Sequence, residues 1–456
     1  MAKSSDKQVA LLLILLNSFI TLFMEAAVGI ALPSIGKEFA IDAVLLSWVA
    51  TSTWLASAMF LVPFGKLADI YGRKKFFGLG IISIIIASFL AMGSKSALGL
   101  IIAQFLQGIG GAMTSGTAIA ILLSVFPAEE RGKVLGIHVT AVYSGLLLGP
   151  IFGGYITQYF GWRSLFLINI IWSFIIIALI FWKLKGEWVG AKGEKYDLGG
   201  SIIYGLMLLA LLYGFSQLPT LLGIWLFLMG IIGLFIFIKR EISIKNPILD
   251  LRFFRNNRVF VFSNLTAVIY FVATSSITFL LSLYLQYIKG LSPQEAGIIL
   301  VAQSVIQACV SPVAGRFSDR YDPQRVVSLG MALNVVGLAL FTRLTETTKL
   351  GFIITSLIIL GMGSALFSSP NTNVVMSSVD KKFYGVTSGI RGTMRLIGQM
   401  LSMGIVMLLF SLYMGRVQIT PESYQQFMNS VHVTFVIGTV LCIGGIFTSL
   451  VRDKGQ

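Results

Sequence analysis

The segment Gly65-Lys-Leu-Ala-Asp-Ile-Tyr-Gly-Arg-Lys-Lys75 joins two long apolar runs of the chain. A shorter version, Gly315-Arg-Phe-Ser-Asp-Arg-Tyr321, follows 250 residues later, again directly after an apolar run. Recurrence of a segment at corresponding places indicates that a chain contains copies of one structural unit. The repeat therefore predicts two related halves, and each copy leaves the second helix of its half.

Apolar runs make up most of the remaining sequence. Of the 456 residues, 56% are hydrophobic and 12% are charged, whereas soluble domains carry about 25% charged residues. The mean hydropathy is +0.87. Most runs approach or exceed the roughly 20 residues that a helix needs to cross a bilayer. We therefore predict an all-α membrane protein with fourteen transmembrane helices, near residues 9–33, 45–65, 76–93, 98–125, 133–158, 162–183, 198–217, 221–239, 259–286, 293–315, 326–343, 350–376, 385–414 and 430–451.

The fourteen runs divide into groups of six, two and six. If the second half begins near residue 259, the last six runs repeat the first six as parallel repeats. The two runs between them then form an inserted pair, flanked by the long polar links near 184–197 and 240–258. We predict an N-terminal six-helix bundle over residues 1–190, an inserted two-helix hairpin over 191–250 and a C-terminal six-helix bundle over 251–456.

The net charge of +15 has two readings, nucleic-acid binding or the charge bias of a membrane protein. With both termini in the cytoplasm, 27 of the 34 Lys and Arg residues lie on the cytoplasmic side, Arg391 and Arg395 included, and 7 lie outside. Such a bias is the positive-inside rule. The distribution predicts a multi-pass protein of the cell membrane with cytoplasmic termini and no nucleic-acid partner.

Patterns typical of enzymes are missing from the sequence. The sequence supports neither a Ser/His/Asp catalytic arrangement nor a metal-binding cluster. The phosphate-binding pattern G-x-x-x-x-G-K-[ST] does not occur. The glycines of Gly108-Ile-Gly-Gly111 lie inside an apolar run, where small residues serve helix packing. We therefore expect no enzymatic activity, no metal and no cofactor, with the proton as the coupling ion.

The segment at residues 65–75 resembles the signature loop of major facilitator transporters. The resemblance implies that Asp69 contacts the start of a helix in the other half and helps to hold the cytoplasmic side closed. Arg73 belongs to the same loop. That helix would begin near Gly385, where the helix dipole favours an anion. Asp69 and Arg73 are accordingly predicted to belong to a gate.

The segment Gly145-Leu-Leu-Leu-Gly-Pro-Ile-Phe-Gly-Gly154 resembles the motif associated with antiporters of the same superfamily. Proline interrupts the backbone hydrogen bonds of a helix, and small residues four positions apart allow close helix packing. Gly149 and Pro150 are therefore predicted to take part in a seal between the halves. The alternative is an ordinary packing face.

Together, these segments and the fourteen runs resemble the fourteen-helix drug:proton antiporter family over the whole chain. Two departures alter the family's arrangement of charges. Gln104 stands where the corresponding motif usually has arginine, and the first helix carries its acid at Glu25, one position after the residue aligned with the family's aspartate, Met24. The family's coupling rules therefore transfer only in part.

Glu25 is the only carboxylate well inside a predicted helix. A charge at that depth costs roughly 2.5–3.5 kcal/mol on the insertion scale, and Thr21 and Asn17 extend the polar face. Burial favours the neutral acid and a cationic substrate favours the anion, so Glu25 is predicted to couple protons to transport. The alternative is an inert, solvated group. His138 is predicted as a proton relay, with a packing histidine as the alternative.

Polar and aromatic residues on the helices that line the superfamily's central cavity are predicted to contact substrate. Their amides can form hydrogen bonds, and their rings can stack on flat or cationic compounds. The set comprises Asn17, Thr21, Trp54, Gln104, Gln107, Tyr143, Asn264, Tyr270, Gln303, Gln307 and Asn371.

The combined prediction is a proton-coupled antiporter that exports hydrophobic cationic or zwitterionic drugs by alternating access. We expect it to work as a monomer whose partners are small hydrophobic substrates, protons and membrane lipids. Three alternatives stay open. A lipid or amphiphile flippase would work without a proton gradient, a narrow-substrate exporter would accept one metabolite or tetracycline, and a sensor or scaffold would transport nothing.

Overall fold

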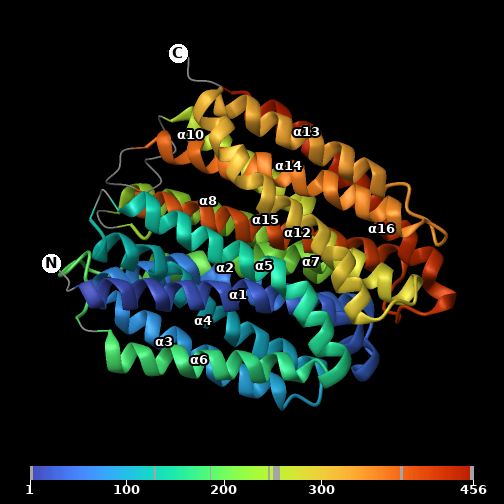
Figure 1. Ribbon diagram of the computed structural model, residues 1–456, viewed down its shortest axis with the longest axis horizontal. Helices are drawn as coiled ribbons and strands as arrows, with labels where there is room; N and C mark the ends of the chain where they lie inside the picture. Colours follow the sequence, from blue (N-terminus) through green and yellow to red (C-terminus); the bar gives the residue numbers. More distant parts are fainter. Residues whose placement is uncertain are drawn as a thin grey trace.

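The computed structural model describes residues 4–127, 130–184, 186–244, 247–249, 257–379 and 384–451. Within these residues, fourteen helical segments are long and apolar enough to cross a membrane, and all regular structure is helical. The predicted all-α fold with fourteen spans is therefore confirmed. The helices run along the long axis of the molecule, and α1 begins at the end where α16 finishes (Figure 1).

Successive helices among the first six run in opposite directions. Asp42 and Ser96 begin two of them by accepting hydrogen bonds from Leu45 N at 2.8 Å and from Gly99 N at 3.2 Å, which satisfies backbone donors that a helix start leaves free. Helix α1 packs on α5, and α4 packs on both α2 and α3. The bounds are α1 (Ser4–Phe39), α2 (Ala43–Tyr71), α3 (Arg73–Met92), α4 (Ala97–Val125), α5 (Arg131–Phe160) and α6 (Arg163–Lys183).

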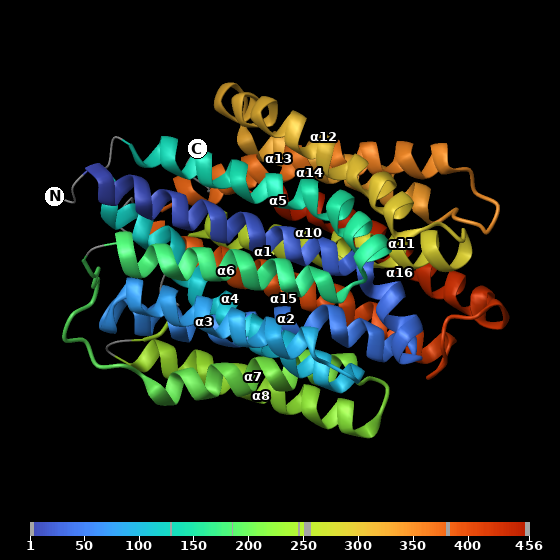
Figure 2. The same ribbon diagram turned by 60° about the horizontal axis from the view of Figure 1, so that its bottom comes forward.

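Helices α7 (Leu198–Ser216) and α8 (Leu221–Ser243) form a hairpin at the edge of the bundle (Figure 2). Helix α7 packs against α2 and also against α15 of the last six helices. The Asp197 carboxylate before α7 accepts a hydrogen bond from Arg240 at 2.8 Å. Burial raises the pKa of Asp197, but hydrogen bonds from Arg240 and from the Gly200 backbone outweigh it and hold the pKa below its usual value. The contact therefore persists at neutral pH.

The remaining helices repeat the packing of the first six. The pairs α1–α5, α2–α4, α3–α4 and α3–α6 correspond to α10–α15, α12–α14, α13–α14 and α13–α16. Between the two sets, α5 packs on α12 and α2 packs on α15. This is the structural counterpart of the repeat seen at residues 65–75 and 315–321. The bounds are α10 (Arg258–Thr274), α11 (Ile277–Leu283), η1 (Tyr284–Ile288), α12 (Pro293–Arg320), α13 (Pro323–Phe341), α14 (Leu350–Ser377), α15 (Tyr384–Tyr413), η3 (Pro421–Ser423) and α16 (Tyr424–Ser449).

The predicted continuous run near 259–286 is divided in the structure. It becomes α10, α11 and the π-helical η1, with a turn at Ser275 and Ser276. At this turn the Ser402 hydroxyl accepts the backbone N–H of Ser276 at 3.1 Å, which replaces a hydrogen bond within the helix. Hydropathy did not predict the break because both pieces are apolar.

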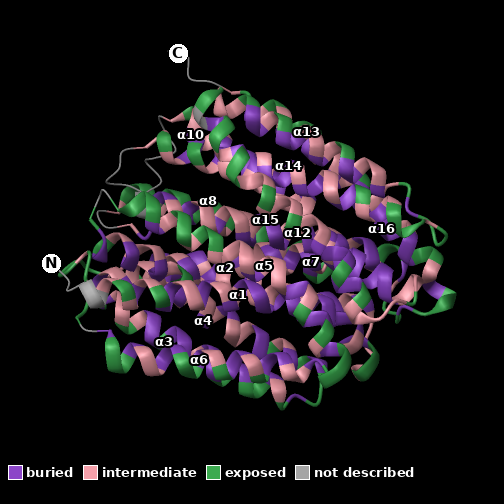
Figure 3. Ribbon diagram, viewed as in Figure 1, coloured by how far each residue is buried: buried purple, intermediate pink, exposed green. Residues whose placement is uncertain are grey.

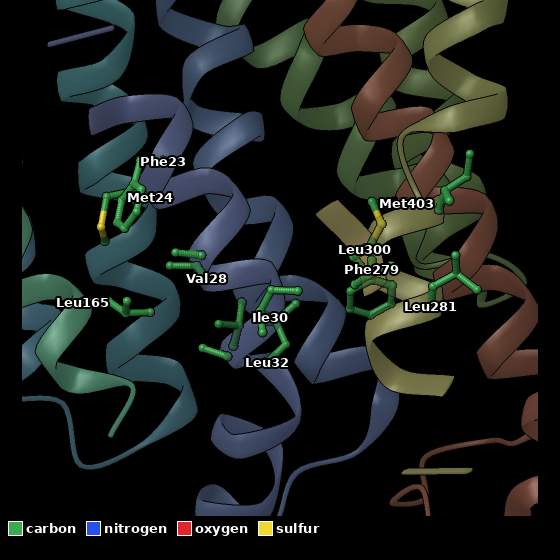
Figure 4. Packing of buried hydrophobic residues seen from close by; sticks show 14 of the residues in the cluster. Phe23, Met24, Val28, Ile30, Leu32, Leu165, Phe279, Leu281, Leu300 and Met403 are labelled. Carbon is green, nitrogen blue, oxygen red and sulfur yellow. The ribbon is translucent and has the colours of Figure 1, made fainter. Parts of the chain in front are cut away.

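Buried and exposed apolar side chains both support a membrane setting. The largest buried cluster joins the two halves and includes Ile30 and Leu32 on α1 with Leu281 and Leu300 on α11 and α12 (Figure 4). Exposed positions occur along the outer helices (Figure 3), and those of α8 include Trp225 and Phe235, which are 61% and 69% exposed. An apolar surface of this kind is stable against lipid.

Candidate functional site

The Glu25 carboxylate lies in the middle of α1 and contacts both halves. Trp54 on α2 donates its Nε1–H to Glu25 Oε1 at 3.1 Å, and Gln399 on α15 donates its Nε2–H to the same oxygen at 3.2 Å. Both donors are neutral, and no described Lys, Arg or His pairs with this carboxylate. Glu25 is partly exposed, so it can receive a proton or a cation.

Other polar residues of α1 face its own half. Thr21 donates to the backbone oxygen of Asn17 at 2.7 Å, and the Asn17 side chain is buried. Ser18 forms a hydrogen bond with His138 Nε2 on α5 at 2.9 Å. Ser18 precedes Glu25 by seven residues, about 10 Å along the helix, and no described hydrogen bond links His138 to Glu25. A relay through His138 stays a prediction.

A second polar contact between the halves involves Tyr143. Its hydroxyl lies 3.2 Å from Ser368 Oγ, joining α5 to α14. One turn along α14, Thr372 accepts a hydrogen bond from Arg391 Nη2 at 2.5 Å. The charge distribution along the sequence placed Arg391 and Arg395 among the cytoplasmic cations, but both lie within the apolar span Thr387–Tyr413. An arginine inside an apolar run is the signal that could have identified them.

Three predicted substrate contacts are buried in helix packing. Tyr270 stacks on Phe367 with ring centroids 4.0 Å apart, and Asn264 donates to the Phe260 oxygen of its own helix at 2.8 Å. Asn371 is also buried. In this conformation no described hydrogen bond links any of the three to Glu25.

The four predicted glutamine contacts are dispersed. Gln104 is buried on α4, where its backbone oxygen accepts a hydrogen bond from Thr53 at 3.1 Å. Gln107 is half-buried, and neither side-chain oxygen has a hydrogen-bond partner within the described part of the chain. Gln303 and Gln307 lie partly exposed on α12. Their roles as substrate contacts stay predictions.

The segment at residues 145–154 places α5 between α1 and α12 at backbone distance. A Cβ atom added at Gly149 would lie 2.6 Å from Ala26 Cβ on α1. One added at Gly154 would lie 2.5 Å from the Pro293 oxygen, and one at Gly297 would lie 2.1 Å from the Pro150 oxygen. Side chains larger than hydrogen cannot occupy these contacts. The small residues therefore bring one helix of each half onto α5.

Direct hydrogen bonds between the halves concentrate at the end of the molecule opposite the termini. Ser282 and Gln286 donate to the backbone oxygens of Gly29 and Ile30, each at 3.0 Å. Tyr287 donates to the Pro33 oxygen at 3.2 Å, and Gln418 donates to the Ala40 oxygen at 2.7 Å. Among the described residues, no hydrogen bond between the halves lies closer to the termini than the Tyr143–Ser368 pair. Apolar packing of α2 on α15 also joins the halves, so it is their hydrogen bonds, and not all of their contacts, that concentrate at this end.

The predicted gate loop is bound to its own half. Asp69 accepts a hydrogen bond from Arg73 at 2.7 Å, and its backbone oxygen accepts N–H groups of Gly190 and Ala191, each at 2.9 Å. The linker after α6 thus folds onto the loop, a contact that the sequence does not predict because the linker is recognisable only by its polarity. No described contact joins Asp69 to Gly385, and the side chains of residues 384–386 lie outside the described part. The gate role stays a prediction.

The fold and this arrangement define a class of protein. Two similarly packed helical halves that meet around mid-membrane polar residues are the architecture of secondary transporters. Within the described residues, no group of three or more His, Cys, Asp or Glu side chains is placed to hold a metal ion.

The sequence pattern of the Major Facilitator Superfamily matches residues 14–403 and, in a second match, residues 263–455. The chain belongs to this superfamily. It is a transporter and not an enzyme.

Named relatives include transporters of different substrates. The chain is 29% identical over 396 residues to the riboflavin transporter RibZ of Clostridioides difficile, covering 86% of this chain and 85% of RibZ. It is 28% identical over 395 residues to the multidrug resistance protein Stp of Mycobacterium tuberculosis, covering 84% and 72%. A bacterial homolog of the human lysosomal transporter Spinster shares the fold, with a TM-score of 0.72, 16% identity and 98% of each chain covered.

Proposed function

We propose that the protein is a proton-coupled antiporter that exports hydrophobic cationic or zwitterionic compounds, drugs among them. The observation that carries the proposal is Glu25, the one carboxylate at the middle of a helix among the described residues, to which Trp54 of one half and Gln399 of the other donate. A group at this position responds to any movement of one half against the other. The similarity to Stp, which is named a multidrug resistance protein, supports drugs as substrates.

The cycle follows from competition for Glu25. Protonation neutralises the Glu25 carboxylate, and the neutral acid is favoured when the interface around it is apolar and closed. A cationic substrate favours the ionised carboxylate instead. With the termini in the cytoplasm, the contacts of Ser282 and Gln286 with α1 close the outer side, so substrate enters from inside. Breaking those contacts and closing the opposite end would release substrate outward and admit a proton.

Uptake into inverted vesicles tests this function. A pH gradient, acid inside, should drive accumulation of a lipophilic cationic dye by the wild-type protein. Glu25→Gln should abolish gradient-driven uptake, because the amide cannot exchange a proton, and Glu422→Gln, at an exposed site, should not. Full gradient-driven uptake by Glu25→Gln would refute the proposal.

A narrow-substrate transporter is the second candidate, favoured by the similarity to RibZ. Competition separates the two functions. A multidrug exporter would have its dye uptake inhibited by several unrelated hydrophobic cations, whereas a narrow transporter would respond to riboflavin or to one other metabolite. A lipid or amphiphile flippase stays an alternative, and its activity would persist without a proton gradient.

A further inference from the structure

Two arginines lie one turn apart inside the span of α15 between Thr387 and Tyr413. Arg391 and Arg395 are four residues apart and therefore share a face of the helix. Gln399, four residues further on, continues this face and contacts Glu25. Measured along the helix axis, Arg395 and Arg391 precede Gln399 by about 6 Å and about 12 Å.

Arg391, Arg395 and Gln399 form a row along α15, and contacts at both ends of the row show which way it faces. Arg391 donates to Thr372 on α14, which lies one turn from the Ser368 that contacts Tyr143 of the other half. At the other end, Gln399 reaches α1, also of the other half. Arg395 lies between them, so its side chain faces the interface between the halves and not the lipid. Both arginines are partly exposed.

The charge of this row is not balanced by the described part of the protein. Arg391 has a neutral partner, Thr372, and Arg395 has no hydrogen-bond or ion-pair partner among the described residues. Charged side chains within a membrane span are costly and mark substrate or ion pathways unless they are paired. Guanidinium groups bind carboxylates, sulfonates and phosphates through paired N–H groups.

We propose that Arg391 and Arg395 form a subsite for an anionic group of the transported compound. The proposal rests on the proposed export function and narrows its substrate class. It favours amphiphilic zwitterions whose acidic group binds the two arginines and whose basic group reaches Glu25 beside Gln399, which follows the arginines by about 6–12 Å along α15. The rigid aromatic part of such a compound would span the distance between them.

Ciprofloxacin and its methyl ester are a suitable probe pair, because the ester keeps the ring and the amine and loses the anion. The measurement is the concentration of each that halves gradient-driven dye uptake into inverted vesicles. For the wild type, the acid should be effective at about tenfold lower concentration than the ester, as expected for one charge-assisted contact. The preference should disappear in Arg391→Gln/Arg395→Gln, while the ester's value stays unchanged.

Control variants separate the subsite from general effects of charge or folding. Arg395→Lys keeps the charge and should keep part of the preference, and Lys239→Gln, at an exposed site on α8, should behave as wild type. If the double variant does not fold, the two single Arg→Gln variants serve, and each should reduce the preference.

Three results would overturn the subsite. Two are equal potency of acid and ester in the wild type and a full preference in the double variant. The third is a preference, measured with the purified protein in phosphatidylcholine proteoliposomes, that disappears when phosphatidylglycerol is included, which would assign the arginines to a lipid headgroup. Absence of gradient-driven dye uptake by the wild type would instead refute the export function itself.

Discussion

Gln399 on α15 donates its side-chain N–H to the Glu25 carboxylate on α1 across 3.2 Å. The two residues are 374 positions apart in the chain and belong to different halves. Trp54 donates to the same oxygen from within the first half. Separation of the halves would remove one donor and leave the other, so the environment of Glu25 depends on conformation.

Loss of the Gln399 donor should impair coupling more than folding. A hydrogen bond to a charged group contributes about 1.5–3 kcal/mol, so Gln399→Ala should lower the initial rate of gradient-driven uptake by about tenfold or more. Gln425→Ala, which removes an exposed glutamine of α16, is the matched control. Equal rates for the two variants would show that the Glu25–Gln399 contact has no part in transport.

The gate loop allows a similar comparison. Asp69→Asn removes the charge that faces Arg73 and should lower transport, whereas the loss of a surface ion pair costs up to about 1 kcal/mol of stability and should leave the protein folded. Glu194→Gln breaks the ion pair, 2.6 Å long, between the linker after α6 and Lys66 of the same loop, and it should transport normally. Normal transport by Asp69→Asn, measured at matched expression, would contradict a gate role.

Gly297 tests the contact between α5 and α12. A leucine there would meet the Pro150 carbonyl, so Gly297→Leu should prevent closure of the end opposite the termini and abolish transport. The test uses a protein in which Cys309 and Cys442 have been replaced and Ser282 has been changed to cysteine. With Gly297→Leu added, this cysteine should react with external thiol reagents faster than in the same protein with Gly297. Gly444→Leu is the control, because its added side chain would meet nothing within 4 Å. Unchanged reactivity would argue against the seal.

Topology can be read by labelling single cysteines with an impermeant reagent. Lys192 and Arg416 are both exposed and lie in loops at opposite ends of the helices. With cytoplasmic termini, position 416 should react in intact cells and position 192 only after permeabilisation. The reverse pattern would invert the orientation and the direction of the proposed cycle.

Local sequence features were enough to predict the fold, and the site was predicted only in part. The number of spans follows from the lengths of the apolar runs, and the length of each run can be read from its own residues. Glu25 was identifiable because a carboxylate in an apolar run is rare. Its partner Gln399 was not, because that contact depends on how the halves pack. Asn264 misled for a related reason: a polar side chain in a helix can bond to its own backbone and stay buried.

Coupling between proton movement and substrate movement can be measured on the purified protein. In proteoliposomes without a membrane potential, addition of a monovalent lipophilic cation should drive protons in the opposite direction through the wild-type protein, because one carboxylate exchanges one proton for one positive charge. An internal pH-sensitive dye reports this flux. Glu25→Gln should abolish this flux. A substrate-driven proton flux of wild-type size in Glu25→Gln would contradict coupling through Glu25.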